Sequence, residues 1–337
     1  MPRTKARQYF SVLLTLLILS APLTAQKKDK SKEREDTTKL SGTLRQDSGD
    51  LSSLNCFYGA GGKADAPNVN GKFTFVKEDA AGTSPKFEVT DDQGVHWKVK
   101  LGQEPQSETA ATRLLWAAGY FVDEDYYLFE FKVANMPKLH RGGQFVSADG
   151  TVHKARLERK IKEIKNLSTW SWFADQPEDR RDMNGLRVMM ALINNWDLKS
   201  VNNSIYEIGG ERRRVVSDLG ASFGNTGSPF TRSKSSAEEY ARSKFIDRSD
   251  REFVDFVMHS RPFFLAGIDV PNYRKRTRME SITKHIPRED AKWLGQRLSA
   301  LSEEKLSDCF RAAGYSPAEI SIYTQTVQKR IAELNAL

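Results

Sequence analysis

Three short strand-like runs between residues 72 and 101 constrain the fold of this chain more than any other feature. The runs KFTFVKE, KFEVTD and VHWKVKL are rich in β-branched and aromatic residues, and only AAGTSP and DQG separate them. Spacers this short join antiparallel neighbours, because a parallel crossover needs a dozen or more residues. The sequence therefore predicts an antiparallel meander.

A helix and a further strand follow the meander. The run ETAATRLLWAA has a hydroxyl side chain in front of it and a glycine behind it, so we expect a helix that starts at Ser107 and ends before Gly119. The aromatic and β-branched run DYYLFEFKV predicts the next strand.

After about Pro137 the pattern becomes helical. Apolar residues recur at spacings of three and four in RLERKIKEIKNL, DMNGLRVMMALINN, AKWLGQRLSALS and PAEISIYTQTVQKRIAEL. Two strand-like pieces, NSIYEI and RRRVVSDL, interrupt this pattern and are linked by GGE. We therefore expect an α+β fold with two lobes. The small antiparallel-sheet lobe with one helix spans residues 51–136, and the larger, mainly helical lobe spans residues 137–337.

The first 25 residues have the pattern of a secretory signal peptide. A basic start, MPRTKAR, precedes the apolar run VLLTLLIL, which is followed by Pro22 and small residues up to Ala25. We expect cleavage after Ala25 and a secreted or periplasmic protein, with an uncleaved anchor as the alternative. Eight strongly apolar residues are too few for a comfortable membrane span, so no stable span is expected after cleavage. Residues 26–50 carry many charges and almost no large apolar side chains, which predicts a disordered linker.

Composition narrows the class of protein further. Charged residues make up 28% of the chain and hydrophobic residues 39%, which is typical of a soluble globular protein. The net charge of +8 is modest, and part of it lies in the leader, so it does not indicate nucleic acid as a partner. The two cysteines, Cys56 and Cys309, could pair in an oxidising compartment, but two separate buried thiols are the preferred interpretation because nothing in the sequence shows that they meet.

Residues 194–203, NNWDLKSVNN, gather polar side chains of the kinds that phosphoryl transfer uses. Asp197 is followed by Lys199 and Asn202 and then, after the predicted hairpin, by Asp218. Such transfer needs a carboxylate that positions the acceptor, a cation near the moving phosphate and oxygen ligands for magnesium. We therefore expect Asp197 and Lys199 to be catalytic and Asn202 and Asp218 to hold the metal. Taken singly, Asp197 is also typical of a turn and Asn202 of a helix cap.

These residues resemble the protein-kinase-like fold. The order Asp-x-Lys-x-x-Asn and then Asp-x-Gly is similar to the catalytic loop and metal-binding motif of serine/threonine kinases, with Leu219 where many kinases have Phe. Asn195 and Trp196 stand in place of the His-Arg pair that usually precedes the Asp. This start to the loop is more similar to the HipA-type and phosphatidylinositol-kinase-like atypical kinases, although HipA-type proteins usually have His at the position of Lys199.

The resemblance implies a phosphate-anchoring lysine on a strand and a glutamate partner on the next helix. Lys98 and Lys100 alternate with apolar residues and therefore share one face of the strand VHWKVKL. Lys100, at the end of the strand, is expected to bind the nucleotide phosphates. Glu108 is its expected partner, with Glu104 in reserve. An exposed ion pair on a solvated strand face is the alternative interpretation.

A turn before this strand resembles the phosphate loop of HipA-type kinases. In GTSPKFEV, the backbone N–H groups of Gly82, Thr83 and Ser84 are expected to approach the nucleotide phosphates. The cofactors implied are ATP and Mg²⁺, with Mn²⁺ as an alternative ion.

The resemblance predicts an exported kinase-like protein that transfers a phosphoryl group from ATP to a hydroxyl of a protein, sugar or lipid. One alternative is a pseudokinase-like module that binds a nucleotide or another ligand without catalysis. A second is a carbohydrate-binding protein of the cell envelope, in which an aromatic cluster stacks on sugar rings; the cluster is Trp170, Trp172 and Phe173.

Overall fold

The computed structural model describes residues 41–337 except residues 48, 174–179, 227–231 and 259–269. The chain divides into two units, residues 1–37 and 38–337, and the fold described here is that of the second unit. The predicted signal peptide and residues 26–40 of the predicted linker lie outside the described residues. Within the described part of the chain, no helix combines the length and the apolar character that a bilayer crossing requires.

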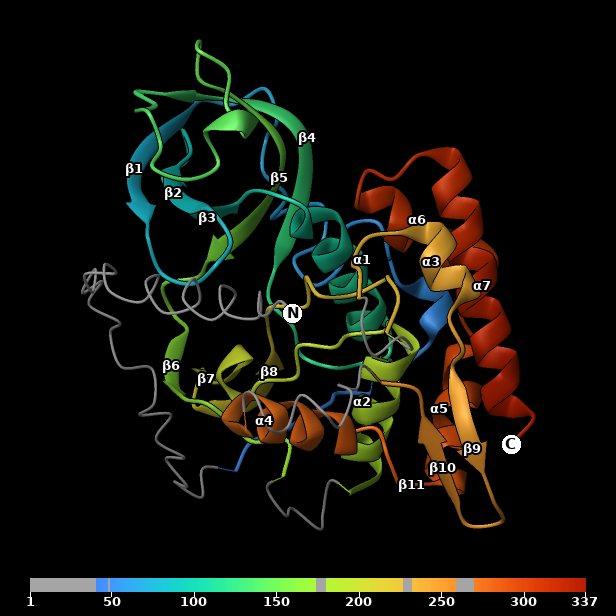
Figure 1. The fold of residues 1–337 in the computed structure, drawn as a ribbon. Coiled ribbons are helices and arrows are strands. Elements are labelled where there is room, and N and C mark those ends of the chain that lie inside the picture. Colours follow the sequence, from blue (N-terminus) through green and yellow to red (C-terminus); the bar gives the residue numbers. More distant parts are fainter. Residues whose placement is uncertain (1–40, 48, 174–179, 227–231, 259–269) are drawn as a thin grey trace, which may run out of the picture. The chain divides into compact units, whose positions relative to one another are not determined.

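The unit is a mixture of strands and helices, as the sequence predicts (Figure 1). The strands are β1 Phe73–Asp79, β2 Lys86–Thr90, β3 His96–Lys100, β4 Asp125–Ala134, β5 Thr151–Lys160, β6 Lys165–Ser168, β7 Asn203–Ile208, β8 Glu211–Val216, β9 Ile246–Ser249, β10 Phe253–Phe256 and β11 Ile286–Pro287. The helices are α1 Glu104–Ala117, α2 Arg180–Leu192, α3 Ala237–Arg242, α4 Val270–Ser281, α5 Arg288–Leu298, α6 Glu303–Ala312 and α7 Pro317–Asn335, with short 3₁₀ turns at Leu51–Ser53, Gly143–Phe145 and Ser200–Asn202.

The first five strands form a barrel in the order β1-β2-β3-β5-β4. The β1–β2 and β2–β3 pairings are antiparallel, which confirms the predicted meander. The sheet is closed by a short parallel pairing in which Phe73 of β1 lies opposite Val133 of β4. Alternate residues of the strands, such as Phe87, Trp97 and Val99, fill the barrel interior.

Strand β5 corrects the prediction of a helix in RLERKIKEIKNL. Residues 151–160 form β5, which lies between β3 and β4 in the barrel, and residues 165–168 form β6. The barrel therefore continues past residue 136, where we placed the end of the small lobe. Because β5 is surrounded by other elements, four consecutive residues, 155–158, are buried, and the sequence has no simple alternation that would indicate a strand.

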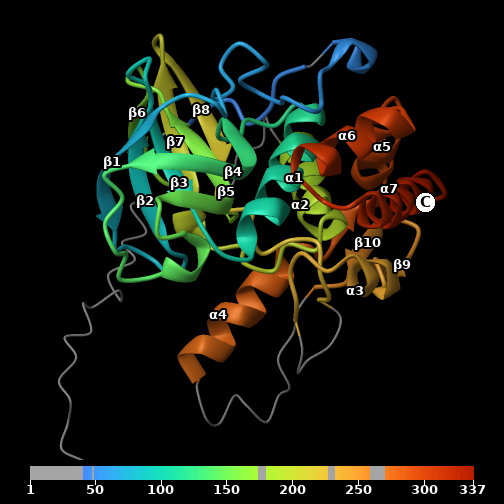
Figure 2. The same cartoon turned by 90° about the horizontal axis from the view of Figure 1, so that it is seen from above.

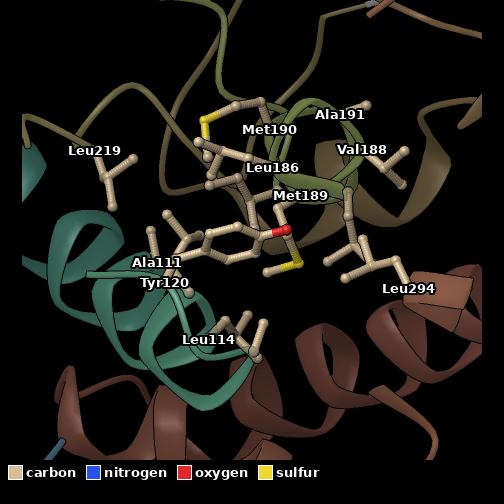
Figure 3. Close-up of a cluster of buried hydrophobic side chains, with 14 of the residues drawn as sticks. Ala111, Leu114, Tyr120, Leu186, Val188, Met189, Met190, Ala191, Leu219 and Leu294 are labelled. Carbon is tan, nitrogen blue, oxygen red and sulfur yellow. The ribbon is translucent and has the colours of Figure 1, made fainter. Parts of the chain in front are cut away.

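Helix α1 connects the barrel to the helical part of the chain. Its buried side chains belong to the larger hydrophobic core, in which Ala111 and Leu114 lie near Met189 of α2 and Leu294 of α5 (Figure 3). Two views show α1 between the barrel and helices α6 and α7 (Figures 1 and 2). We expected this helix to be part of the small lobe. The structure shows that its buried residues also pack in the core formed by the helices of the larger lobe.

The remaining strands build two small sheets. Strands β7 and β8 form the predicted hairpin, joined by Gly209 and Gly210. Both glycines have positive φ angles, 60° and 86°, which a type I′ turn requires. Strand β6 completes this sheet, and β9, β10 and β11 form another.

The chain before the barrel is partly ordered, which corrects the predicted linker of residues 26–50. Thr43 forms a bridge with Arg213 of β8, and Arg45 forms one with Tyr120. The intervening Leu44 has no exposed surface. Leu44 is part of a core formed by distant elements, and its burial helps to hold this charged segment against the fold.

The close packing of α2 against Tyr120 and against Trp293 of α5 generates a first prediction. A Cβ atom at Gly185 of α2 would lie 2.5 Å from Tyr120 Oη and 2.8 Å from a ring carbon of Trp293. Such overpacking costs about 1–3 kcal/mol, more than the gain of about 1 kcal/mol in helix propensity. We expect Gly185→Ala to lower the free energy of unfolding, measured by urea denaturation.

Gly143→Ala is the matched control, since a Cβ atom there meets nothing within 4 Å. A Gly185→Ala protein as stable as the parent would show that Tyr120 and Trp293 do not pack this closely against α2.

Candidate active site

Lys100, the last residue of β3, is buried, and its ammonium group contacts three carboxylates. Its Nζ lies 2.8 Å from Glu104 Oε2, 2.8 Å from Glu108 Oε2 and 2.7 Å from Asp218 Oδ1. Strand β3 supplies the lysine, α1 supplies both glutamates, and the loop after β8 supplies Asp218. The structure therefore brings together the predicted phosphate anchor, its predicted partner and a predicted metal ligand.

Both candidate partners of Lys100 contact it, rather than Glu108 alone. Helix α1 begins at Glu104, three residues before the predicted start, with Pro105 in its first turn. Glu104 and Glu108 are therefore one helical turn apart on the same face. Glu104 also accepts hydrogen bonds from Ser84 Oγ at 2.7 Å and from Lys234 Nζ at 2.6 Å.

Burial and charge oppose one another in this cluster. Burial alone would lower the pKa of Lys100, but the charges of Glu108, Asp218 and Glu104 outweigh it and hold that pKa above its usual value. Burial would raise the pKa of Asp218, yet the nearby Lys100 ammonium lowers it overall. For Glu104, Lys100 overcomes the effect of burial and brings the pKa to about 2. Glu108 is fully enclosed, so burial raises its pKa despite Arg156 and Lys100.

Arg156 is a second buried cation that the sequence analysis missed. It lies on β5, and its guanidinium is 2.8 Å from Glu158, 3.3 Å from Asp125 and 3.4 Å from Glu108. We had placed this residue in a helix, so no spacing argument could bring it near Glu108. Arg156 supports the orientation of Glu108 from the side opposite Lys100.

The glycine-containing turn lies beside the strand end that carries Lys100. Residues 82–84 connect β1 and β2, and Lys86 pairs with Lys100 in the register of β2 and β3. Gly82 has a φ of +73°, and Arg141 Nη1 donates a hydrogen bond to its carbonyl at 2.9 Å. Gly82 and Thr83 are exposed, while Ser84 is half-buried against Glu104. The turn is thus placed where its backbone could meet a ligand held by Lys100.

Asp197 lies on the loop that follows α2. Lys199 Nζ donates to Asp197 Oδ2 at 2.7 Å, and Asn202 Nδ2 donates to the Asp197 carbonyl at 3.0 Å. The second carboxylate oxygen, Oδ1, is buried and accepts no hydrogen bond from the described residues. The three residues of the predicted motif are therefore in contact.

Backbone hydrogen bonds join this loop to the loop that carries Asp218. Ser217 N donates to Asn202 O at 3.1 Å, and Trp196 N donates to Ala221 O at 3.4 Å. Asp218 itself has a φ of +53°, an uncommon conformation for a residue other than glycine. The two halves of the predicted motif, separated in sequence by the β7–β8 hairpin, are held side by side.

The basic run of residues 273–278 also reaches this loop. The run lies on α4, where Arg276 is half-buried and its Nη1 is 4.0 Å from Asp197 Oδ1. Its guanidinium also lies 5.7 Å from the centre of the Trp196 ring. Arg276 therefore adds positive charge beside Asp197.

The site offers oxygen ligands for a divalent cation. Carboxylate oxygens of Glu104, Glu108 and Asp218 lie within 4.8 Å of one another. The Asp218 side chain is 49% exposed, so it is accessible to a ligand. Carboxylate oxygens are the ligands that Mg²⁺ prefers. Of the two predicted metal ligands, Asn202 and Asp218, this set contains Asp218, and the Lys100 ammonium contacts all three carboxylates.

Two other features lie apart from this cluster. A cavity of about 550 Å³ is lined by Trp116, Asp123, Arg159 and Tyr206, among others, and includes none of the predicted site residues. Trp170 and Trp172 are buried, with 4% and 1% exposure, and they pack edge to face. A sugar-stacking platform needs open ring faces, which these two tryptophans do not offer, while Phe173, the third member of the cluster, is 41% exposed.

The described fold and site can be compared with known proteins. Neither a protein-family model nor a curated protein sequence matches the chain. The proinflammatory kinase CtkA of Helicobacter pylori is similar in structure, with 9% sequence identity and a TM-score of 0.45 over 78% of this chain and 96% of that chain. The Golgi casein kinase is similar with 10% identity and a TM-score of 0.40, over 80% of this chain and 73% of that chain. A structure of the Golgi casein kinase with Mn and ADP bound has 11% identity and a TM-score of 0.38, over 80% and 72% of the two chains.

The low pKa of Glu104 predicts a pH-dependent contribution to stability. Its pKa is about 2 in the fold against an ordinary value of 4.5, so the folded state favours the charged form. This stabilisation is complete above about pH 4.5 and is lost as the pH falls towards 2. We expect Glu104→Gln to be less stable than the parent at pH 7, with the difference in melting temperature shrinking below pH 4.5.

Thermal unfolding between pH 3 and pH 7 measures this difference. Glu211→Gln is the control, because that side chain is 74% exposed. A Glu104→Gln difference that stays constant across the range would contradict a charged, ion-paired Glu104.

Proposed function

We propose that this protein is an ATP-dependent phosphotransferase that acts on a hydroxyl acceptor. The observation that carries the proposal is the ionic cluster of the buried Lys100 and Glu108 with the exposed Asp218, joined through backbone hydrogen bonds to the loop of Asp197 and Asn202. Phosphoryl transfer depends on positioning and on charge stabilisation, and this arrangement supplies charged groups from three elements at one place.

Each residue has a distinct role in the proposal. Lys100, oriented by Glu108, binds the nucleotide phosphates. Asp218 and Asn202 hold Mg²⁺ or Mn²⁺, which neutralises phosphate charge when bound. The turn that carries Gly82, Thr83 and Ser84 contributes backbone N–H groups to the phosphates.

Asp197 is the proposed acceptor-positioning carboxylate. Its Oδ1 accepts no hydrogen bond from the described residues, and in the proposal it accepts one from the acceptor hydroxyl. Its Oδ2 accepts a hydrogen bond from Lys199, which orients the carboxylate. In the proposal, Lys199 turns towards the moving phosphoryl group when a nucleotide is present.

A pseudokinase-like binding module remains the second candidate function. It uses the same cluster to hold a nucleotide and needs neither Asp197 nor Lys199. The presence of both residues, in contact with each other, favours the catalytic proposal. Export is part of the proposal and rests on the leader pattern of residues 1–25.

Nucleotide binding is tested by thermal unfolding with and without ATP and Mg²⁺. We expect the parent protein to gain about 3 °C or more in melting temperature at saturating ATP and Mg²⁺. Asp218→Asn removes a charged metal ligand with little change in shape, so the magnesium-dependent part of the gain is expected to disappear. Asp149→Asn is the matched control, since Asp149 is 57% exposed on the barrel. Absence of any gain in the parent protein with ATP or ADP and either ion would rule out both candidate functions.

Catalysis is tested by transfer of labelled γ-phosphate to the protein itself or to hydroxyl-bearing acceptors. Asp197→Asn is expected to lower the rate by about 10²–10⁴-fold while the nucleotide-dependent gain in melting temperature remains. Asp247→Asn, at an exposed residue of β9, is the control. Binding without transfer in the parent protein would favour the pseudokinase-like module, and equal rates in parent and Asp197→Asn would refute the role of Asp197.

A further inference from the structure

The two cysteines of the chain lie near each other in the folded protein. Cys56 lies before the barrel and Cys309 lies on α6, and neither has any exposed surface. Both belong to the same hydrophobic core, and both are free thiols in the structure. Cys309 Sγ also donates to the Lys305 carbonyl at 3.4 Å. The chain has no other cysteine, so each thiol has only one possible intramolecular partner.

Independent contacts hold the two backbones beside each other. Lys305 Nζ, from α6, donates to the Leu54 carbonyl at 2.5 Å. The Arg311 guanidinium, also from α6, lies 5.7 Å from the centre of the Phe57 ring. These contacts bracket Cys56 on both sides in sequence and Cys309 on both sides in its helix. The approach of the two segments is therefore imposed by the surrounding fold.

We propose that Cys56 and Cys309 form an intramolecular disulfide bond that fastens residues 51–59 to α6. A disulfide requires two cysteines whose backbones already lie close together, and contacts that do not involve sulfur hold the neighbours of Cys56 against α6 on either side of Cys309. The leader pattern predicts a compartment in which such bonds persist.

The bond would form by thiol–disulfide exchange with a small-molecule or protein disulfide as the oxidant. The side-chain interaction with Cys309 lowers the pKa of Cys56, which makes Cys56 the attacking thiolate. Attack gives a mixed disulfide and releases one thiolate of the oxidant. The Cys309 sulfur then attacks the Cys56 sulfur and releases the second thiolate. The two thiol protons of the protein pass to the two leaving thiolates, so the protein loses two electrons and the oxidant gains them.

The proposed bond also bears on α1. Arg113 of α1 donates to the Phe57 carbonyl at 3.1 Å, directly next to Cys56 in the chain. A Cβ atom at Gly59 would lie 2.6 Å from the Arg113 side chain, so the segment wraps closely around this arginine. Fixing residues 51–59 to α6 thus restrains α1, the helix that carries Glu104 and Glu108. This consequence does not depend on the proposed function.

Refolding in a glutathione buffer tests the proposal on the full chain. Denatured, reduced protein is refolded with equal amounts of oxidised and reduced glutathione, quenched with an alkylating reagent and analysed by intact mass and peptide mapping. We expect a monomer that lacks two hydrogen atoms, carries no alkyl group and yields a Cys56–Cys309 cross-linked peptide. Dithiothreitol is expected to lower its melting temperature by roughly 5 °C or more, because the bond closes a long loop. Amide hydrogen exchange in α1 is expected to be slower in the oxidised form.

The variants Cys56→Ala and Cys309→Ala serve as controls, alone and together. Each single variant is expected to retain one thiol or one glutathione adduct, and the double variant to show no response of its melting temperature to dithiothreitol. The measurement on the parent protein decides the matter even if a variant fails to fold. Natively folded parent protein with two alkylated thiols, with glutathione on each cysteine, or with intermolecular disulfides would overturn the proposal.

Discussion

The ion cluster around Lys100 is the interaction on which the rest of the structure depends. Its ammonium group joins three parts of the fold, because β3 carries the lysine, α1 carries two glutamates and the loop after β8 carries Asp218. Removing an ion from water costs several kcal/mol unless partners of opposite charge compensate for it. This cost is comparable to the free energy of unfolding of a whole domain. The cluster therefore favours only those arrangements in which barrel, helix and loop approach one another correctly. Arg156 extends the same constraint through β5.

Apolar packing makes this arrangement rigid. The first turns of α1 carry the glutamates that contact Lys100, and its later turns are buried in the larger core with α2 and α5. One helix therefore fixes the barrel relative to the helical core. A second buried cation supports the loop of Asp197. Arg330 of α7 donates to the Leu192 carbonyl at 2.7 Å and to Asn194 Oδ1 at 2.8 Å, where the chain leaves α2. Asn194 has a φ of +53°, and these bonds help to hold that conformation. The candidate catalytic loop thus begins at a fixed point.

The sequence analysis predicted the elements that patterns within a few residues determine, and it missed those that depend on contacts between remote segments. Helices α2, α5 and α7 and the β7–β8 hairpin were predicted because periodic apolar residues and paired glycines act over a few residues. Strand β5 was missed because it is buried between two other strands, so its burial pattern reflects its neighbours rather than its own alternation. The start of α1 was placed three residues late, because we took the hydroxyl of Ser107 as the cap, and Glu104 and Pro105 lie before it. That error left Glu104 as a reserve residue, although it contacts Lys100 as closely as Glu108 does.

The sequence by itself determined the chemical types and the order of the site residues: a strand lysine, a helix glutamate, an aspartate loop and a second aspartate after a hairpin. These follow from local spacing, which the chain carries in any conformation. Only the tertiary structure decided which groups share one ionic cluster and that Arg156 extends it. It also placed Arg276 near Asp197 and the neighbours of Cys56 against α6 on either side of Cys309. Such contacts join residues whose separation along the chain carries no information about distance, because they arise when burial of a common core brings remote segments together.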